Sequence, residues 1–348
     1  MNFDDSKKIY NIYELIQSSY SLHAIYVLTK IGAFDLIEES PQSLNQISKF
    51  FGIDTSFFKS LLSLSVALRF IRIRDDRYYI TRRGRTLTKR NGSWLRYYLL
   101  VWGQQLNPAF NNLQKQLQSG ENAFQLFHGN LIWDFYKIDP LQNDVFVEFQ
   151  NRVTKQVHVA LISELINIDD SKNFVDVAGG IGSLTCALIS KYEYLKATIC
   201  DQPSNAAKAI ANIKAQGLID SCDFVGVNIF DSIPFGHDLY LIKHVLHDWD
   251  DANAISILTS ISNAMRPDSR LIIIEGVSDR EFAEGFINPE HLLTRDIEQR
   301  IWTSGRVRSS LDFDKICEAA KLKILSIKHS SIIDISFIEI KKAPYLLV

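Results

Sequence analysis

The chain has 348 residues, of which 46% are hydrophobic and 22% are charged, and its formal net charge is −2. These values are typical of a globular protein and exclude collagen-like, fibrous and disordered classes. The length predicts two domains, or one large domain with an appendage. No apolar run approaches the roughly 18–20 residues of a membrane span. Residues 1–8 are polar, unlike the start of a signal peptide.

The four cysteines are widely separated along the chain: Cys186, Cys200, Cys222 and Cys317. Zinc sites need clustered ligands, so this spacing predicts buried structural thiols and no metal. Free thiols suit a reducing compartment, and we therefore expect a cytoplasmic protein. The near-neutral charge argues against affinity of the whole protein for nucleic acid.

The first hundred residues have the pattern of a winged helix. Apolar residues at spacings of three and four predict helices over residues 10–36, 43–51 and 55–68. Alternating residues around Asp75-Asp76 predict a hairpin over residues 70–80. A basic cluster surrounds this hairpin, which leaves a DNA-reading wing as an alternative. The helix over residues 55–68, however, is mostly apolar and lacks side chains that could bond to base edges, which favours burial.

Long helices rich in aromatic residues are predicted between Gly92 and Asn167, with breaks at Gly120 and Asp139-Pro140. Most such aromatic side chains form core, but some could line a pocket for a flat apolar substrate.

From Asp170 onward, short strands alternate with helices. Strands are predicted at residues 174–178, 197–201, 223–227, 238–242 and 271–275, and a closing hairpin at residues 323–329 and 334–341. This alternation is typical of an α/β fold with a doubly wound, Rossmann-like parallel sheet.

The first strand of this region leads into a glycine turn, Gly179-Gly180-Ile181-Gly182, and the second strand ends in Asp201. Glycines let a ligand approach the backbone, and the acid can accept hydrogen bonds from ribose hydroxyls. The spacing is not GxGxxG, and Asp176 makes the turn acidic. A cationic ligand such as S-adenosylmethionine therefore fits better than a dinucleotide, although NAD stays open on these residues alone.

The segment 241–251 is more specific, because a strand ends at Lys243 and is followed by His247-Asp248-Trp249. With it the chain resembles the small-molecule O-methyltransferases of plants and bacterial natural-product pathways, which use S-adenosylmethionine. The resemblance covers nearly the whole chain and also includes residues 120–124 with His128-Gly129, 176–182, 201–203, 271–275 and 306–308.

The resemblance implies a domain organisation and a set of partners. It places a winged-helix-like dimerisation domain at residues 1–95, linking helices of the acceptor pocket at residues 96–167 and the cofactor-binding catalytic domain at residues 168–348. The expected assembly is a homodimer, with no role for nucleic acid or membrane. The expected substrate is an aromatic or polyketide-like secondary metabolite, as in antibiotic biosynthesis, with S-adenosylhomocysteine as the second product.

Site residues follow from the same resemblance, position by position. His247 would be the general base, and its imidazole suits proton removal near neutral pH. His244 has no matching role and is expected to be structural. The cofactor would be held by Asp176, Gly179, Gly180, Gly182, Asp201, Asn228, Ile229, Phe230, Lys243 and Thr154. The acceptor would be contacted by Phe146, Gln150, Trp133 and Asp296.

The chain departs from the family pattern at two positions. Asn228 stands where an aspartate is usual, and its amide can still accept a hydrogen bond from adenine. Val307 replaces a glutamate that normally steadies the histidine, and valine cannot hydrogen-bond. We expect Glu339 to be the second flanking acid and Asp248 to belong to the catalytic set, with Asp296 or Glu298 able to compensate.

The loss of the glutamate at position 307 keeps one alternative open. The chain could be a relative that retains the fold and uses the cofactor electrostatically for a pericyclic, hydroxylation or decarboxylation reaction, because fold alone does not fix function.

Overall fold

The computed structural model describes residues 3–160, 162, 166, 168, 171–279, 290–330 and 333–343, with side chains from residue 12 onward. The chain divides into two compact units. The first comprises Met1–Pro108 and Leu141–Arg152, and the second comprises Ala109–Pro140 and Val153–Val348. The predicted linking segment, residues 96–167, is thus shared between the two units. The three-part functional division of the chain stays a prediction.

The first unit begins with two helices where one was predicted. Helix α1 (Phe3–Ile31) ends before Gly32, whose φ of 83° is left-handed, and α2 (Ala33–Glu39) follows. A residue in this conformation interrupts the hydrogen-bonding pattern of a right-handed helix, and glycine adopts it without steric cost. The prediction of one continuous helix over residues 10–36 was therefore wrong at Gly32.

The winged-helix pattern of the first unit is present. Ser43 and Gln46 form a reciprocal capping box at the start of α3 (Leu44–Phe51), and Asp54 caps α4 (Thr55–Ala67). The hairpin pairs β2 (Ile71–Arg74) with β3 (Arg77–Ile80), and β1 (Gln42–Ser43) adds to β3. Asp75 and Asp76 both have positive φ, as a two-residue hairpin turn requires.

Helices α1 to α4 enclose a shared core in the first unit, whose buried members include Leu28, Phe34, Phe58 and Leu62. The remaining elements of this unit, or shared with the second, are α5 (Arg82–Arg85), α6 (Trp94–Val101), η1 (Trp102–Leu106), α7 (Asn107–Phe110) and α11 (Pro140–Val153).

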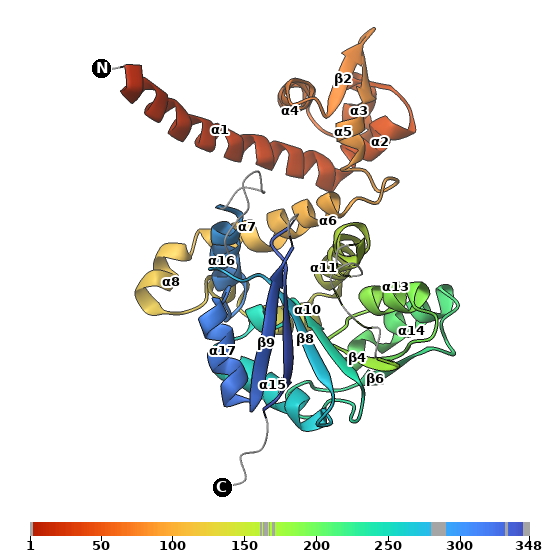
Figure 1. The fold of residues 1–348 in the computed structure, drawn as a ribbon. Helices are drawn as coiled ribbons and strands as arrows, with labels where there is room; N and C mark the ends of the chain where they lie inside the picture. Colours follow the sequence, from red (N-terminus) through yellow and green to blue (C-terminus); the bar gives the residue numbers. More distant parts are fainter. Residues whose placement is uncertain are drawn as a thin grey trace. The chain divides into compact units, whose positions relative to one another are not determined.

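The second unit is built on a seven-stranded sheet with the order β6-β5-β4-β7-β8-β10-β9 (Figure 1). Its strands are β4 (Asn173–Val177), β5 (Lys196–Asp201), β6 (Cys222–Gly226), β7 (Leu239–Lys243), β8 (Arg270–Glu275), β9 (Leu322–His329) and β10 (Ser336–Lys342). Strands β4 to β8 are parallel, while β10 runs antiparallel to β8 and to β9. The predicted α/β class and closing hairpin are confirmed.

Helices cover both faces of this sheet (Figure 1). One core lies under α15 (Asp251–Ala264) and α17 (Ser310–Ala319), and the other contains residues of α13 (Ser183–Lys191) and α14 (Ala206–Ala215). Other helical elements of this unit are α8 (Leu113–Ser119), α9 (Ala123–His128), α10 (Ile132–Ile138), η2 (Thr154–His158), η3 (Pro203–Asn205), η4 (Leu246–Asp248) and α16 (Glu290–Trp302).

The central parallel strands β4, β7 and β8 are buried on both faces, which explains their continuous apolar runs; residues 271–274 of β8, for example, are all nearly inaccessible. All four cysteines are buried and free, as predicted. Among the residues that the structure describes, no helix is long and apolar enough to cross a membrane.

Candidate active site

Polar side chains gather at the carboxyl edge of the parallel strands. Asp201, Lys243 and Glu275 are the last residues of β5, β7 and β8, and Asp176 precedes the last residue of β4. Because parallel strands end at the same edge, one surface of the second unit carries all four groups. Open α/β sheets bind their ligands at this edge.

The glycine turn after β4 approaches its surroundings closely. A Cβ on Gly182 would lie 2.2 Å from Ile199, and one on Gly179 would lie 2.7 Å from the Asp176 carboxyl, whereas Gly180 faces open space. The backbone N–H of Gly180 donates to Asp201, with N and Oδ2 2.7 Å apart. The turn is therefore hydrogen-bonded to the acid of the neighbouring strand, and its side at Gly180 is open to a ligand.

Of the two charged groups near the ends of β4 and β7, Asp176 is buried and Lys243 is half-buried. Burial raises the pKa of Asp176 to about 6, although the hydrogen bond that Thr185 donates and the positive charge of Lys243 both act to lower it. Burial lowers the pKa of Lys243 to about 8 against the opposing effect of Asp176 and Glu275. The protonation states of Asp176 and Lys243 therefore depend on the charge of any ligand bound beside them.

An aromatic pair follows β6 and β7. The rings of Phe230 and Trp249 meet edge to face, with their centroids 4.9 Å apart. Asn228 accepts from the N–H of Phe230 and donates to Asp231, so its amide shapes the turn that carries Ile229 and Phe230. Thr154, the remaining residue predicted for the cofactor, is buried at the start of η2, which packs against α13.

The segment that carries His247 is organised by the buried carboxylate of Glu275. Its Oε1 accepts hydrogen bonds from the backbone N–H groups of Val245 and Leu246, each at 2.9 Å, and from that of His247 at 3.4 Å. Its Oε2 forms an ion pair with His247, 2.8 Å from Nδ1. One carboxylate therefore fixes both the backbone and the ring of the histidine.

This geometry shifts the pKa values of His247, Glu275 and Asp248. Burial by itself lowers the pKa of His247, but the carboxylates of Glu275 and Asp248 outweigh it and raise this pKa above its ordinary value of 6.5. Burial raises the pKa of Glu275, and His247 reverses that and lowers it. Asp248, with Oδ1 3.6 Å from His247 Nε2, has its pKa raised by burial to about 7.

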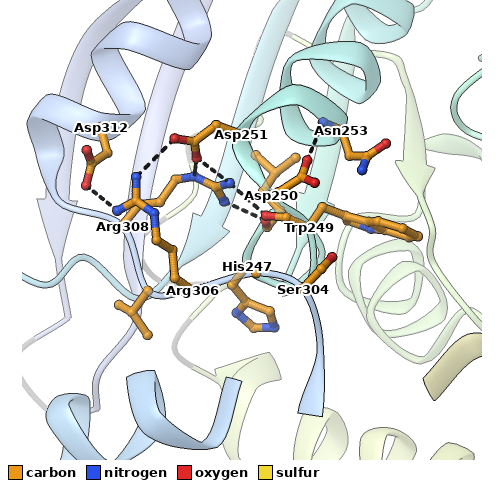
Figure 2. Close-up of polar contacts among 12 residues, drawn as sticks. His247, Trp249, Asp250, Asp251, Asn253, Ser304, Arg306, Arg308 and Asp312 are labelled. Atoms are coloured by element: carbon orange, nitrogen blue, oxygen red, sulfur yellow. Dashed lines mark hydrogen bonds and ion pairs between the residues drawn. The ribbon is translucent and has the colours of Figure 1, made fainter. Parts of the chain in front are cut away.

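Arg308 and Gly305 support the chain segment that carries His247. Figure 2 shows Arg308 beside Asp251 and Trp249. The fully buried Arg308 donates to the carbonyl oxygens of Leu246 (2.5 Å) and Trp249 (2.8 Å) and pairs with Asp251. Gly305 lies against the same segment, because a Cβ there would come within 1.9 Å of the His247 carbonyl oxygen. The Gly305-Arg306-Val307-Arg308 motif thus supports the histidine-bearing segment.

One expectation about the acids needs revision. Glu339 pairs with Arg270 and Ser326, at the level of the amino end of β8, so its assignment as a flanking acid of His247 was wrong. The acid that flanks His247 is Glu275. Its position at the end of β8, the strand beside β7, is the sequence signal that could have identified it. Val307 is buried and offers no side-chain polar group, but its N–H donates to Asp296 at 2.9 Å, which anchors the loop.

The predicted acceptor residues are divided between the units. Trp133 lies on α10 with its ring stacked on Trp249 at a centroid distance of 6.5 Å. Asp296 on α16 is engaged by Val307 and Arg300. Phe146 and Gln150 are half-buried on α11 in the first unit, and their role stays a prediction.

Sequence reasoning missed a row of buried imidazoles beside the histidine. The ring of His244 lies 5.3 Å from that of His247 and 5.2 Å from that of His158, centroid to centroid. His158 lies far away in sequence on η2, so no local pattern revealed it. Arg295 of α16 donates to Nδ1 of His244 at 3.3 Å.

His244, His247 and Glu275 also offer one ligand atom each within 4.8 Å of one another, a spacing that a metal ion could bridge. The 2.8 Å ion pair leaves no room for a cation between Glu275 and His247 Nδ1, and the Arg295 guanidinium opposes a second positive charge. The arrangement favours proton sharing, and the expectation of no metal stays a prediction.

Replacing Glu275 with Gln should lower the pKa of His247, because the amide removes the main charge that favours the imidazolium. We expect a decrease of about one unit or more, measured by NMR titration of ¹⁵N-labelled histidine. Glu339→Gln is the matched control and should leave the His247 titration unchanged. An unchanged pKa in Glu275→Gln would contradict the described ion pair.

Comparison with known proteins agrees with this arrangement. Residues 110–322 match the family model for the O-methyltransferase domain. A mitomycin biosynthesis 6-O-methyltransferase from Streptomyces lavendulae is 26% identical over 317 residues, covering 89% of this chain and 88% of that protein.

Solved structures show the same likeness. The structure of a mitomycin 7-O-methyltransferase has a TM-score of 0.90 at 25% identity and covers 98% of this chain and 99% of its own. An O-methyltransferase from neocarzinostatin biosynthesis, solved with S-adenosylhomocysteine and 1,4-dihydroxy-2-naphthoic acid, has a TM-score of 0.80 at 23% identity and covers 92% and 95% of the two chains. Since the family model spans more than half of its residues, this chain belongs to the O-methyltransferase family.

Proposed function

We propose that this O-methyltransferase methylates a phenolic hydroxyl of an aromatic or polyketide-like secondary metabolite, with His247 as the general base. The observation that carries the proposal is the Glu275–His247 ion pair at the edge of the sheet. Because Glu275 engages Nδ1, the proton of the hydroxyl goes to Nε2 as the oxygen becomes nucleophilic. The carboxylate then stabilises the imidazolium that forms.

The cofactor is S-adenosylmethionine, which supplies an electrophilic methyl group when bound. We assign its ribose to Asp201, its methionine portion to the glycine turn with Asp176, Lys243 and Thr154, and its adenine to the segment 228–230. The open face of Gly180 and the acidic character of the turn support these assignments, since a cationic ligand is favoured beside carboxylates.

Glu275 also bears on the alternative of a non-methylating reaction. That alternative arose from Val307, which removes one acid from the histidine. The base nevertheless keeps a buried carboxylate partner, and methyl transfer depends mainly on positioning of oxygen, methyl carbon and sulfur. We therefore favour methyl transfer. A cytoplasmic location stays a prediction.

His247→Asn tests the assignment of the base. We expect formation of methylated product and S-adenosylhomocysteine, followed by mass spectrometry on a panel of phenolic acceptors, to fall at least about 100-fold. Affinity for S-adenosylhomocysteine, measured by calorimetry, should change little. His237→Asn, at a half-buried histidine packed on Tyr240, is the control and should retain activity.

Comparable methyl transfer in His247→Asn would remove the base from the mechanism. Conversion of an acceptor by the wild-type protein without production of S-adenosylhomocysteine would instead support the non-methylating alternative.

We further propose that the protein forms a homodimer through α1 of the first unit. Every side chain from residue 12 to residue 20 is exposed, including large apolar ones, and such continuous apolar exposure marks interaction surfaces. The exposed large apolar residues of this segment are Ile12, Tyr13, Leu15, Ile16 and Tyr20.

Analytical ultracentrifugation should show a dimer for the wild-type protein and a monomer for Leu15→Glu with Ile16→Glu, because buried charges oppose association. Leu117→Glu, on an equally exposed leucine of α8, should stay dimeric. A wild-type monomer at tens of micromolar would refute this proposal.

A further inference from the structure

The row of imidazoles contains two nitrogen atoms for which the described residues provide no partner. His158, His244 and His247 follow one another at centroid distances of 5.2 and 5.3 Å. Nε2 of His244 and Nδ1 of His158 are both inaccessible and have no hydrogen-bond partner within the described part of the chain. Only His247 of the three is used by the proposed mechanism.

The neighbours of His244 fix its proton. Arginine can only donate, so the Arg295 guanidinium at 3.3 Å makes Nδ1 the acceptor and leaves the hydrogen on Nε2. Burial, with Arg295 and Lys243 nearby, lowers the pKa of His244 well below its ordinary value, so the ring is neutral. Nε2 is therefore a buried N–H donor, and the adjacent cation polarises it toward an oxygen.

His158 is held in the same neutral state. Burial lowers its pKa well below the ordinary value, and Lys243 and Arg295 act in the same direction. An inaccessible donor or acceptor without a partner is energetically costly, and so is the φ of 52° at His244, which is not a glycine. Such costs gather at ligand sites, where a bound group supplies the missing hydrogen bonds.

We propose that His244 and His158 form an acceptor subsite for a carbonyl or carboxylate oxygen on the carbon next to the one that bears the reacting hydroxyl. The inference rests on the proposed function and narrows its substrates to ortho-hydroxy carbonyl compounds. The stacking of His244 on His247, with ring centroids 5.3 Å apart, supports this adjacency of the two oxygens. Arg295 and Lys243 favour an oxygen that carries negative charge.

The subsite complements the residues assigned to the cofactor. Asp176, Asp201 and the glycine turn offer acids and backbone groups to a cationic ligand, whereas the imidazole row offers a donor backed by cations. The shared carboxylate Glu275 links the row to the base: its Oε2 lies 2.8 Å from His247 Nδ1 and 3.9 Å from His244 Nδ1. One substrate molecule can therefore bind this subsite through its second oxygen while its hydroxyl contacts His247.

Calorimetry on protein saturated with S-adenosylhomocysteine tests the subsite with three probes: 3-hydroxy-2-naphthoate, its isomer 6-hydroxy-2-naphthoate and 2-naphthol. The wild-type protein should bind the first probe about tenfold or more tightly than either of the others, because only there does the second oxygen neighbour the hydroxyl. His244→Phe should abolish this preference while S-adenosylhomocysteine affinity stays within about twofold.

His158→Phe, which does not alter the left-handed backbone position, tests the subsite independently of whether His244→Phe folds, and it should reduce the preference. His237→Phe changes a half-buried histidine whose Nδ1 is likewise inaccessible and unpartnered in the described chain, and it should leave the preference unchanged. Thermal melting identifies any unfolded variant.

Equal binding, or no binding, of the three probes by wild-type protein that still binds S-adenosylhomocysteine would overturn the subsite and leave the proposed function standing. A loss of S-adenosylhomocysteine affinity in both histidine variants with the probe preference retained would also overturn it, since the nitrogens would then serve the cofactor. Failure of the wild-type protein to bind S-adenosylhomocysteine would reject the proposed function itself.

Discussion

The site depends on one buried carboxylate. Glu275 ends β8 in the interior of the protein, where an unpaired charge would be very unfavourable. Its carboxylate charge is stabilised there because four neighbouring groups interact with it. Three are backbone N–H groups of the segment 245–247, and the fourth is the ring of His247. The carboxylate therefore determines where the chain turns after β7 and which nitrogen of His247 remains available for chemistry.

The rest of the second unit positions Glu275 beside the segment that carries His247. The parallel register of β7 and β8 brings Lys243 beside Ile274, so that the residues following each strand meet above the sheet edge. Arg308 donates hydrogen bonds to the segment that carries His247. Gly305 lets the chain pack closely against this segment because it has no side chain. The N–H of Val307 donates to Asp296, so the loop is anchored through its backbone.

The sequence predicted what is encoded locally. Alternating strands and helices, the glycine turn and the hairpin turn at Asp75-Asp76 depend on neighbouring residues, and each was found where expected. Contacts between distant segments were not predictable in this way. Glu339 was predicted and Glu275 was missed because strand order and register were unknown. The approach of His158 to His244 depends on tertiary packing between segments far apart in sequence. Gly32 ended a helix whose periodicity continued past it.

The central claim is that Glu275 makes His247 the base of methyl transfer. The most direct measurement is the pH dependence of kcat/KM for methyl transfer to an acceptor that the wild-type protein uses. A base acts in its deprotonated form, and the carboxylates raise the pKa of His247, so the rate should rise about tenfold per pH unit at low pH and level off above pH 6.5. A profile that is flat from about pH 5 to 8, or that falls with increasing pH, would contradict the account.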